Sequence, residues 1–292
     1  MSYSFSFEIE LSRPRVAPKL ARYLRVAVCA LMPAPLIIAA DIKLESDWRT
    51  AMSSAVAAVN ANNFPKAEQL FQMAVQEADR FEAGDPRRGA TINALGLLFK
   101  EEKKYADAEK AFGKAIVIME KAYGAESLDV GNVNYNLATV MMAEGHYEAA
   151  LPVILRSRAV FDKNLGKQSL KTASALCMAG DAYRSLKKYE DAEGMLKQCA
   201  DSREAAGGME NAELADALYS LALVYQQLGK YAAADARLKL TAKIREITLG
   251  VTSPQFAEAL EAHASLLKAM GRDQEAAKDL AMAGAVRRSA KK

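Results

Sequence analysis

Residues 136–166 read NLATVMMAEGHYEAALPVILRSRAVFDKNLG, and the spacing of small and aromatic residues in this stretch recurs along most of the chain. The aromatic residue returns at almost constant spacing, at Phe64, Tyr105, Tyr147, Tyr189 and Tyr231. Asp273 stands at the next step of the same spacing. Three residues after each of these six positions stands an alanine, at Ala67, Ala108, Ala150, Ala192, Ala234 and Ala276. Six copies of one pattern indicate an internal repeat.

The small residues indicate helices that cross closely. Further small residues stand nine before the aromatic position, at Ala55, Gly96, Ala138, Gly180, Ala222 and Ala264, and ten after it, at Ala74, Ala115, Ser157, Cys199, Thr241 and Ala283. A larger residue at such a crossing costs roughly 1–3 kcal/mol of strain. Large apolar residues such as Leu221, Val224 and Tyr225 lie between these positions at helical spacing. Each repeat therefore predicts two amphipathic helices joined by a short turn.

The expected helix ends follow the same period. Glycine recurs where a second helix should close, at Gly124, Gly166, Gly208 and Gly250. Three residues later stands a residue suited to capping the next helix, at Ser127, Ser169, Asn211 and Ser253. Pro254 then occupies a first helical position, where its missing N–H is tolerated.

The segments Asn136-Leu137-Ala138, 144–150 and Leu165-Gly166 resemble the tetratricopeptide repeat. The 42-residue period resembles the longer-helix subtype of kinesin light chains and many bacterial proteins. The resemblance covers about residues 48–284 and implies an all-α fold, a right-handed α-solenoid of about six helix-turn-helix repeats. Their approximate bounds, within an array spanning 41–284, are 48–86, 87–128, 129–170, 171–212, 213–254 and 255–284. The first and sixth repeats deviate from the pattern, as terminal capping repeats do.

The first 40 positions have the order of an export signal. Basic residues end at Arg25, and an uncharged run, 26–40, follows before Asp41. This run is shorter than the roughly 20 residues of a transmembrane helix and ends in small residues. The order predicts a signal peptide cleaved near Ala40 and a periplasmic or secreted protein. The basic region is long for a signal peptide, because it extends to Arg25. Two alternatives therefore remain: an uncleaved anchor in the inner membrane, and a segment with neither role.

Charge argues against a nucleic-acid partner. The chain has 292 residues and a formal net charge of +3, and the segment 1–40 supplies this excess with five basic and two acidic side chains. The remainder holds equal numbers of basic and acidic side chains, without the basic excess that nucleic-acid binding uses. Arg287, Arg288, Lys291 and Lys292 crowd the last six positions, and we expect residues 285–292 to form a solvated basic tail.

The resemblance implies a binding groove. In tetratricopeptide arrays the first helix of each repeat lines a concave groove. Any one of the residues at the corresponding positions here could belong to an ordinary solvated face. For the groove as a whole we favour binding, because Tyr, Asn and Gln suit a peptide's backbone and side chains. The candidate groove residues are Asn93, Lys100, Asn132, Tyr135, Asp181, Arg184, Asp216, Tyr219, Gln226 and Glu261.

No catalytic, cofactor or metal site is expected. His146 lies in a predicted turn and His263 on an apolar helix stretch, and neither belongs to a recognisable catalytic motif. Cys199 occupies a small-residue position and Cys177 maps to the groove face. A disulfide between them would require an oxidising compartment and is not favoured, because nothing in the spacing brings the side chains together. Trp48 is expected to cover the first core layer.

The sequence therefore predicts a non-catalytic scaffold that binds a peptide or a partner's helix in its groove. One alternative is a membrane-tethered assembly factor that keeps its N-terminal segment. The other is a small-ligand binder or enzyme that uses the groove. The sequence leaves the partner and the oligomeric state open.

Overall fold

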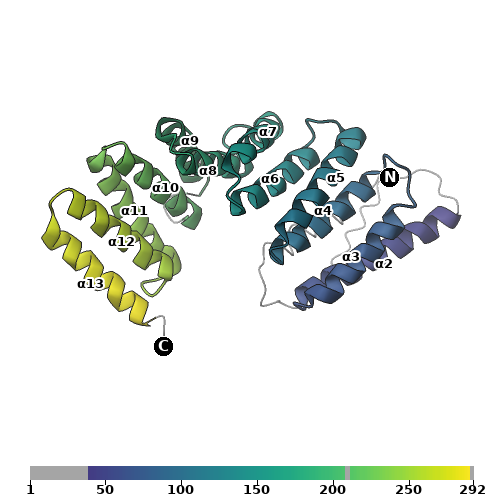
Figure 1. The fold of residues 1–292 in the computed structure, drawn as a ribbon, viewed down its shortest axis with the longest axis horizontal. Helices are drawn as coiled ribbons and strands as arrows, with labels where there is room; N and C mark the ends of the chain where they lie inside the picture. The colour runs from purple at the N-terminus through teal and green to yellow at the C-terminus, as the bar shows by residue number, and fades with distance from the viewer. Residues whose placement is uncertain (1–38, 208–210, 290–292) are drawn as a thin grey trace, which may run out of the picture. The chain divides into compact units, whose positions relative to one another are not determined.

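The computed structural model describes residues 39–207 and 211–289, and these residues form helices and no strand. The twelve helices (Figure 1) are α2 (Ala39–Asn60), α3 (Phe64–Ala78), α4 (Pro86–Glu101), α5 (Tyr105–Tyr123), α6 (Leu128–Ala143), α7 (Tyr147–Leu165), α8 (Leu170–Ser185), α9 (Tyr189–Gly207), α10 (Ala212–Gln227), α11 (Tyr231–Leu249), α12 (Pro254–Ala269) and α13 (Asp273–Ser289). The predicted all-α helical repeat is confirmed.

The chain divides into two compact units. The first ends at Ala125 and contains α2–α5, and the second begins at Glu126 and contains α6–α13. Within each unit, successive helices pack as pairs, and each second helix also contacts the first helix of the next pair. In the second unit α8 contacts both α6 and α10 directly. We call α6, α8, α10 and α12 the first-helix layer.

The small-residue positions lie where the paired helices cross. The six alanines that follow the repeat's aromatic position are all fully buried. Among the glycines of the described ranges, Gly180 has the nearest neighbour: a Cβ built on it would lie 2.5 Å from Cγ of Leu196 and 3.3 Å from that residue's backbone nitrogen. Packing of this kind leaves no room for a methyl group unless α8 and α9 separate.

The predicted caps are also present. The side chains of Ser127, Ser169 and Ser253 each accept a hydrogen bond from the backbone N–H three residues on. Asn211 accepts from two backbone N–H groups of α10. Gly166 closes α7 with φ +88° and ψ 159°, so its φ is positive as predicted, whereas its ψ is extended rather than left-handed helical. Gly208 lies outside the described residues.

Trp48 covers the first layer of the hydrophobic core in the first unit, as predicted. The side chain is buried, its Nε1–H donates to Thr91 Oγ1 at 2.8 Å, and its ring meets Phe81 edge-on at 6.1 Å. It therefore joins α2 to α4 and to the turn that follows α3. Phe81 in this turn is buried, and the preceding helix α3 has 15 residues where α5 has 19.

The two ends of the array differ in how far the structure describes them. Residues 1–38 of the predicted export segment lie outside the described residues, and Ala39 and Ala40 begin α2. At the other end α13 continues to Ser289, beyond residue 284. None of the helices in the described ranges combines the length and the apolar character needed to cross a membrane.

Two glycines test the packing. We expect Gly180→Ala to lower the free energy of unfolding by about 1–3 kcal/mol, because the added methyl group overlaps Leu196. Gly194→Ala on α9 is the matched control, since nothing lies within 4 Å of its Cβ position. There, better helix propensity should raise stability by about 0.5–1 kcal/mol. Equal shifts of both variants in urea unfolding would refute this account of the crossing.

Candidate functional site

The predicted groove residues fall in both units. Asn93 and Lys100 lie on α4 of the first unit, and the other eight lie on the first-helix layer of the second. None of the ten is buried. The layer carries Asn132 and Tyr135 on α6, Asp181 and Arg184 on α8, Asp216, Tyr219 and Gln226 on α10, and Glu261 on α12.

The first pair of layer residues is held by neighbouring helices. Asn132 accepts a hydrogen bond from Nζ of Lys171, on α8, at 2.7 Å. The ring of Tyr135 leans on buried Phe161 of α7 with 6.3 Å between centroids, and Lys171 lies 5.6 Å from the same Phe161 ring. Asn132 and Tyr135 are therefore braced from α7 and α8 and keep defined positions on the layer.

An arginine series behind the layer was missed by the sequence reasoning. Arg203, Arg245 and Arg287 recur with the period of the repeat on the second helices α9, α11 and α13. Their period is visible in the sequence, but they lie on second helices, whereas the expected groove is lined by first helices. Each guanidinium reaches a polar side chain on a first helix, namely Ser174, Asp216 and Glu261 respectively.

Arg245 is the central member of the arginine series. Its Nη2 donates to Asp216 Oδ1 on α10 at 3.0 Å, and its Nη1 donates to Glu258 Oε2 on α12 at 3.0 Å and to the carbonyl of Gln255 at 2.8 Å. The guanidinium also lies 4.7 Å from the ring centroid of Tyr219. This side chain is buried and joins three helices beneath the layer surface.

Arg287 forms the outermost pair. It binds Glu261 through Nε at 3.1 Å and Nη2 at 2.9 Å, a bidentate geometry. The hydrogen bonds from Arg287 hold the pKa of the Glu261 carboxyl below its usual value, against the opposing effect of burial. Arg287 thus has a specific partner within α12, although the sequence placed it in a solvated tail.

A disulfide joins Cys177 of α8 to Cys199 of α9, with their Cα atoms 5.4 Å apart. The sequence expectation against this bond was wrong. The two cysteines occupy different positions of the repeat, so periodicity alone could not pair them. Packing of α8 on α9 at Gly180 brings the two positions together.

His263 is buried, and both of its ring nitrogens meet carboxylates. Nε2 lies 2.8 Å from Asp235 Oδ1 on α11, and Nδ1 lies 2.6 Å from Asp279 Oδ2 on α13. Burial acts to raise the pKa of Asp235, but hydrogen bonds from Lys239 and His263 outweigh it, and this pKa is lowered. The histidine thus holds three helices together, in keeping with the structural role expected for it.

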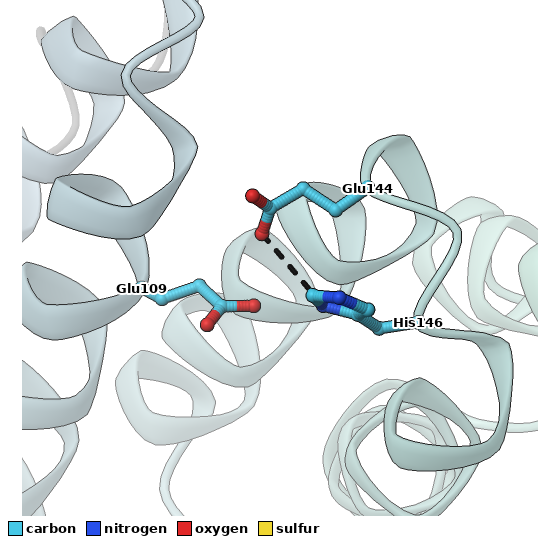
Figure 2. A group of neighbouring side chains, drawn as sticks. All are labelled: Glu109, Glu144 and His146. Carbon is cyan, nitrogen blue, oxygen red and sulfur yellow. Dashed lines mark ion pairs between the residues drawn. The ribbon is translucent and has the colours of Figure 1, made fainter.

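His146 stands at the exposed turn between α6 and α7, as predicted. Its Nδ1 lies 3.8 Å from Glu144 Oε2 (Figure 2), and the two groups form an ion pair when the imidazole is protonated. Glu109, also labelled in Figure 2, belongs to α5 of the first unit.

The first unit carries a separate groove of about 770 Å³ between α3 and α5, with α4 as its floor. The floor is apolar and includes Ile92, Leu95 and Phe99. The α5 side carries Lys114 and the ion pair of Lys110 with Asp107.

Comparison with protein families gives matches of one kind. Models of the tetratricopeptide repeat match residues 88–129, 129–205 and 214–255. Together they span more than half of the 292 residues. The clustered mitochondria protein homolog of Debaryomyces hansenii is 27% identical over 124 residues, a stretch that covers 41% of this chain and 9% of that protein.

Solved structures share the fold. BtubC from P. vanneervenii superimposes with a TM-score of 0.63 at 17% identity, covering 84% of this chain and 91% of that one. A protein with kinesin light chain TPR-like repeats from Podosopora anserina gives 0.63 at 19% identity, covering 73% and 99%. The apo form of RapI gives 0.65 at 14% identity, covering 84% and 98%. At these identities the likeness concerns the fold alone.

The arginine series allows a matched test of burial. We expect Arg245→Ala to lower the free energy of unfolding by about 2–3 kcal/mol, because it leaves the carbonyl of Gln255 and two carboxylates without their donor. Arg287→Ala removes a half-exposed pair and should cost at most about 1 kcal/mol. Thermal and urea unfolding measure both. An Arg245 effect no larger than that of Arg287 would contradict the role of burial.

Proposed function

This chain belongs to the tetratricopeptide repeat family, and on that premise we propose that it is a non-catalytic scaffold for protein–protein interaction. The proposed binding surface is the first-helix layer of the second unit, and the proposed partner is a peptide segment or a helix of another protein. No nucleic acid and no cofactor take part in this proposal.

The observation that carries the proposal is the bracing of Tyr135 and Tyr219. Both rings are half-exposed on the layer, two repeats apart at the same repeat position, and each rests on a buried side chain of a second helix. Tyrosine offers large contact area with few rotatable bonds, and a braced side chain loses little freedom on binding. Such a surface is suited to holding a flexible segment.

We also propose that the chain works in an oxidising compartment, as an exported protein. Disulfides persist in the periplasm and outside cells and are rare in a reducing cytosol. The Cys177–Cys199 bond therefore supports the export signal read in residues 1–40. Cleavage near Ala40 would release a periplasmic or secreted scaffold, whereas retention of the segment would give a tethered assembly factor at the inner membrane.

A second candidate function has one observation in its favour. The groove over α4 has a volume typical of small-ligand sites and an apolar floor. Its lining holds three basic side chains, Arg88, Lys110 and Lys114, against Asp79 and Asp107, which leaves one positive charge in excess. Its chemistry suits an amphiphilic anion such as a long-chain carboxylate. Titration with a fluorescent fatty acid, compared between the natural chain and Leu95→Asp, tests this candidate; equal binding would reject it.

Photo-crosslinking tests the main proposal. A benzoylphenylalanine placed at Tyr135 or Tyr219 should give a discrete crosslinked partner in living cells, because both rings lie on the proposed surface. Matched probes at Ala159 and Asp201, exposed on the second helices α7 and α9, should give none. Products from the second-helix probes alone would move the binding surface to the opposite layer.

Thiol labelling tests the compartment. In chain isolated from cells under acid quench, Cys177 and Cys199 should resist alkylation until a reductant is added, since they are bonded to each other. The same chain expressed without residues 1–40 should remain in the cytosol and label at both positions. Free thiols in both preparations would contradict export.

A further inference from the structure

We infer that the site around Arg245 recognises a basic side chain, a lysine or arginine of the bound peptide. This inference rests on the proposed function and specifies the chemistry of its partner. The site, which we call the Arg245 site, consists of Asp216 and Tyr219 on α10, Glu258 on α12 and Arg245 beneath them on α11.

Charge at the Arg245 site is distributed unequally with depth. Two carboxylates share one guanidinium, which leaves one negative charge in excess. The side chains of Asp216 and Glu258 are 67% and 47% exposed, whereas that of Arg245 is 4% exposed. An approaching ligand therefore meets the carboxylates first, and the positive charge stays behind them.

The buried guanidinium also orients the carboxylates. Each carboxylate accepts a hydrogen bond from Arg245 at 3.0 Å, so both acidic groups are drawn to the same point of the surface from neighbouring helices. A basic side chain placed between the two carboxylates would lie on their solvent side, opposite the buried guanidinium, so that each carboxylate would have a cation on both sides. An acidic peptide would instead meet two carboxylates in front of a covered guanidinium, which disfavours it.

Tyr219 adds an aromatic surface to the site. Its ring is half-exposed and already supports a cation, Arg245, at 4.7 Å. Burial, with a smaller contribution from Glu258, raises the pKa of the Tyr219 phenol, so the hydroxyl stays protonated and neutral at physiological pH. A neutral phenol ring attracts cationic groups through its π face.

One donor of the site is unsatisfied. Nε of Arg245 is buried and, within the described ranges, meets no acceptor, although the two Nη atoms of the same guanidinium are bonded. Buried N–H groups usually have a partner. The protein covers this donor, so a bound peptide meets the two exposed carboxylates and Tyr219, and its basic side chain supplies the positive charge that the Arg245 site lacks.

A random dodecapeptide library displayed on phage provides the probe, with the full chain immobilised. Selected peptides are synthesised with a fluorophore and titrated against three proteins: the natural chain, Asp216→Asn with Glu258→Gln, and Asp201→Asn with Glu246→Gln. The control pair removes the same two charges from exposed positions of α9 and α11. The first double variant keeps an oxygen acceptor at each position for Arg245, and circular dichroism checks that it folds; Glu258→Gln alone serves if it does not.

The inference expects selected peptides to carry a lysine or arginine that cannot be replaced by norleucine. Their affinity should fall about tenfold or more in the Asp216/Glu258 variant and less than about twofold in the control. Peptides that bind the layer without a basic residue, or that lose affinity equally in both variants, overturn this inference and leave the proposed scaffold function standing. A library that yields no binder overturns the proposed function as well.

Discussion

The close crossing of paired helices at small residues is the constraint on which the rest of the structure depends. Where Gly180 faces Leu196, a methyl group would overlap the leucine side chain and press on its backbone nitrogen, so α8 and α9 pack this closely only with glycine there. This contact fixes the register of α8 on α9, and the fully buried alanines at the repeat positions do the same in every pair. With the register fixed, a side chain at a given repeat position points the same way in each repeat. The arginine series and the braced tyrosines follow from that regularity, whereas the disulfide follows from the packing of one helix pair.

The sequence predicted what is local or periodic. The caps of Ser127 and Ser253 depend on residues three apart, and the buried alanines depend on a spacing that repeats six times. The disulfide depends on neither. Cys177 shares a repeat position with Tyr135, and Cys199 shares one with Ser157, so the bond becomes visible only when the two helices have been packed. The role of Arg245 was not predicted for a different reason. Its period is visible in the sequence, but its side chain crosses from a second helix to the first-helix layer.

One position of the repeat holds apolar residues in some repeats and arginine in others. Met119 and Phe161 are buried hydrophobic residues, and Arg203, Arg245 and Arg287 follow them with the period of the repeat. In the second unit the layer residues that this position meets also differ: Tyr135 lies beside Phe161, Asp216 and Tyr219 beside Arg245, and Glu261 beside Arg287. The core supplies stability in every repeat, so the side chains that reach the surface from this position are free to differ. The chemistry of the layer thus changes through substitutions that leave the helix crossings untouched.

The Cys177–Cys199 bond also affects how the second unit opens. In a stack where each pair contacts only its neighbours, local unfolding starts at an end and proceeds pair by pair. The bond closes α8 and α9 into one covalent loop in the interior of this stack. Opening that begins at α13 meets a loop there whose two helices cannot separate widely, and opening that begins at α6 meets the same obstacle. The oxidised chain therefore contains an internal boundary to fraying, which reduction would remove.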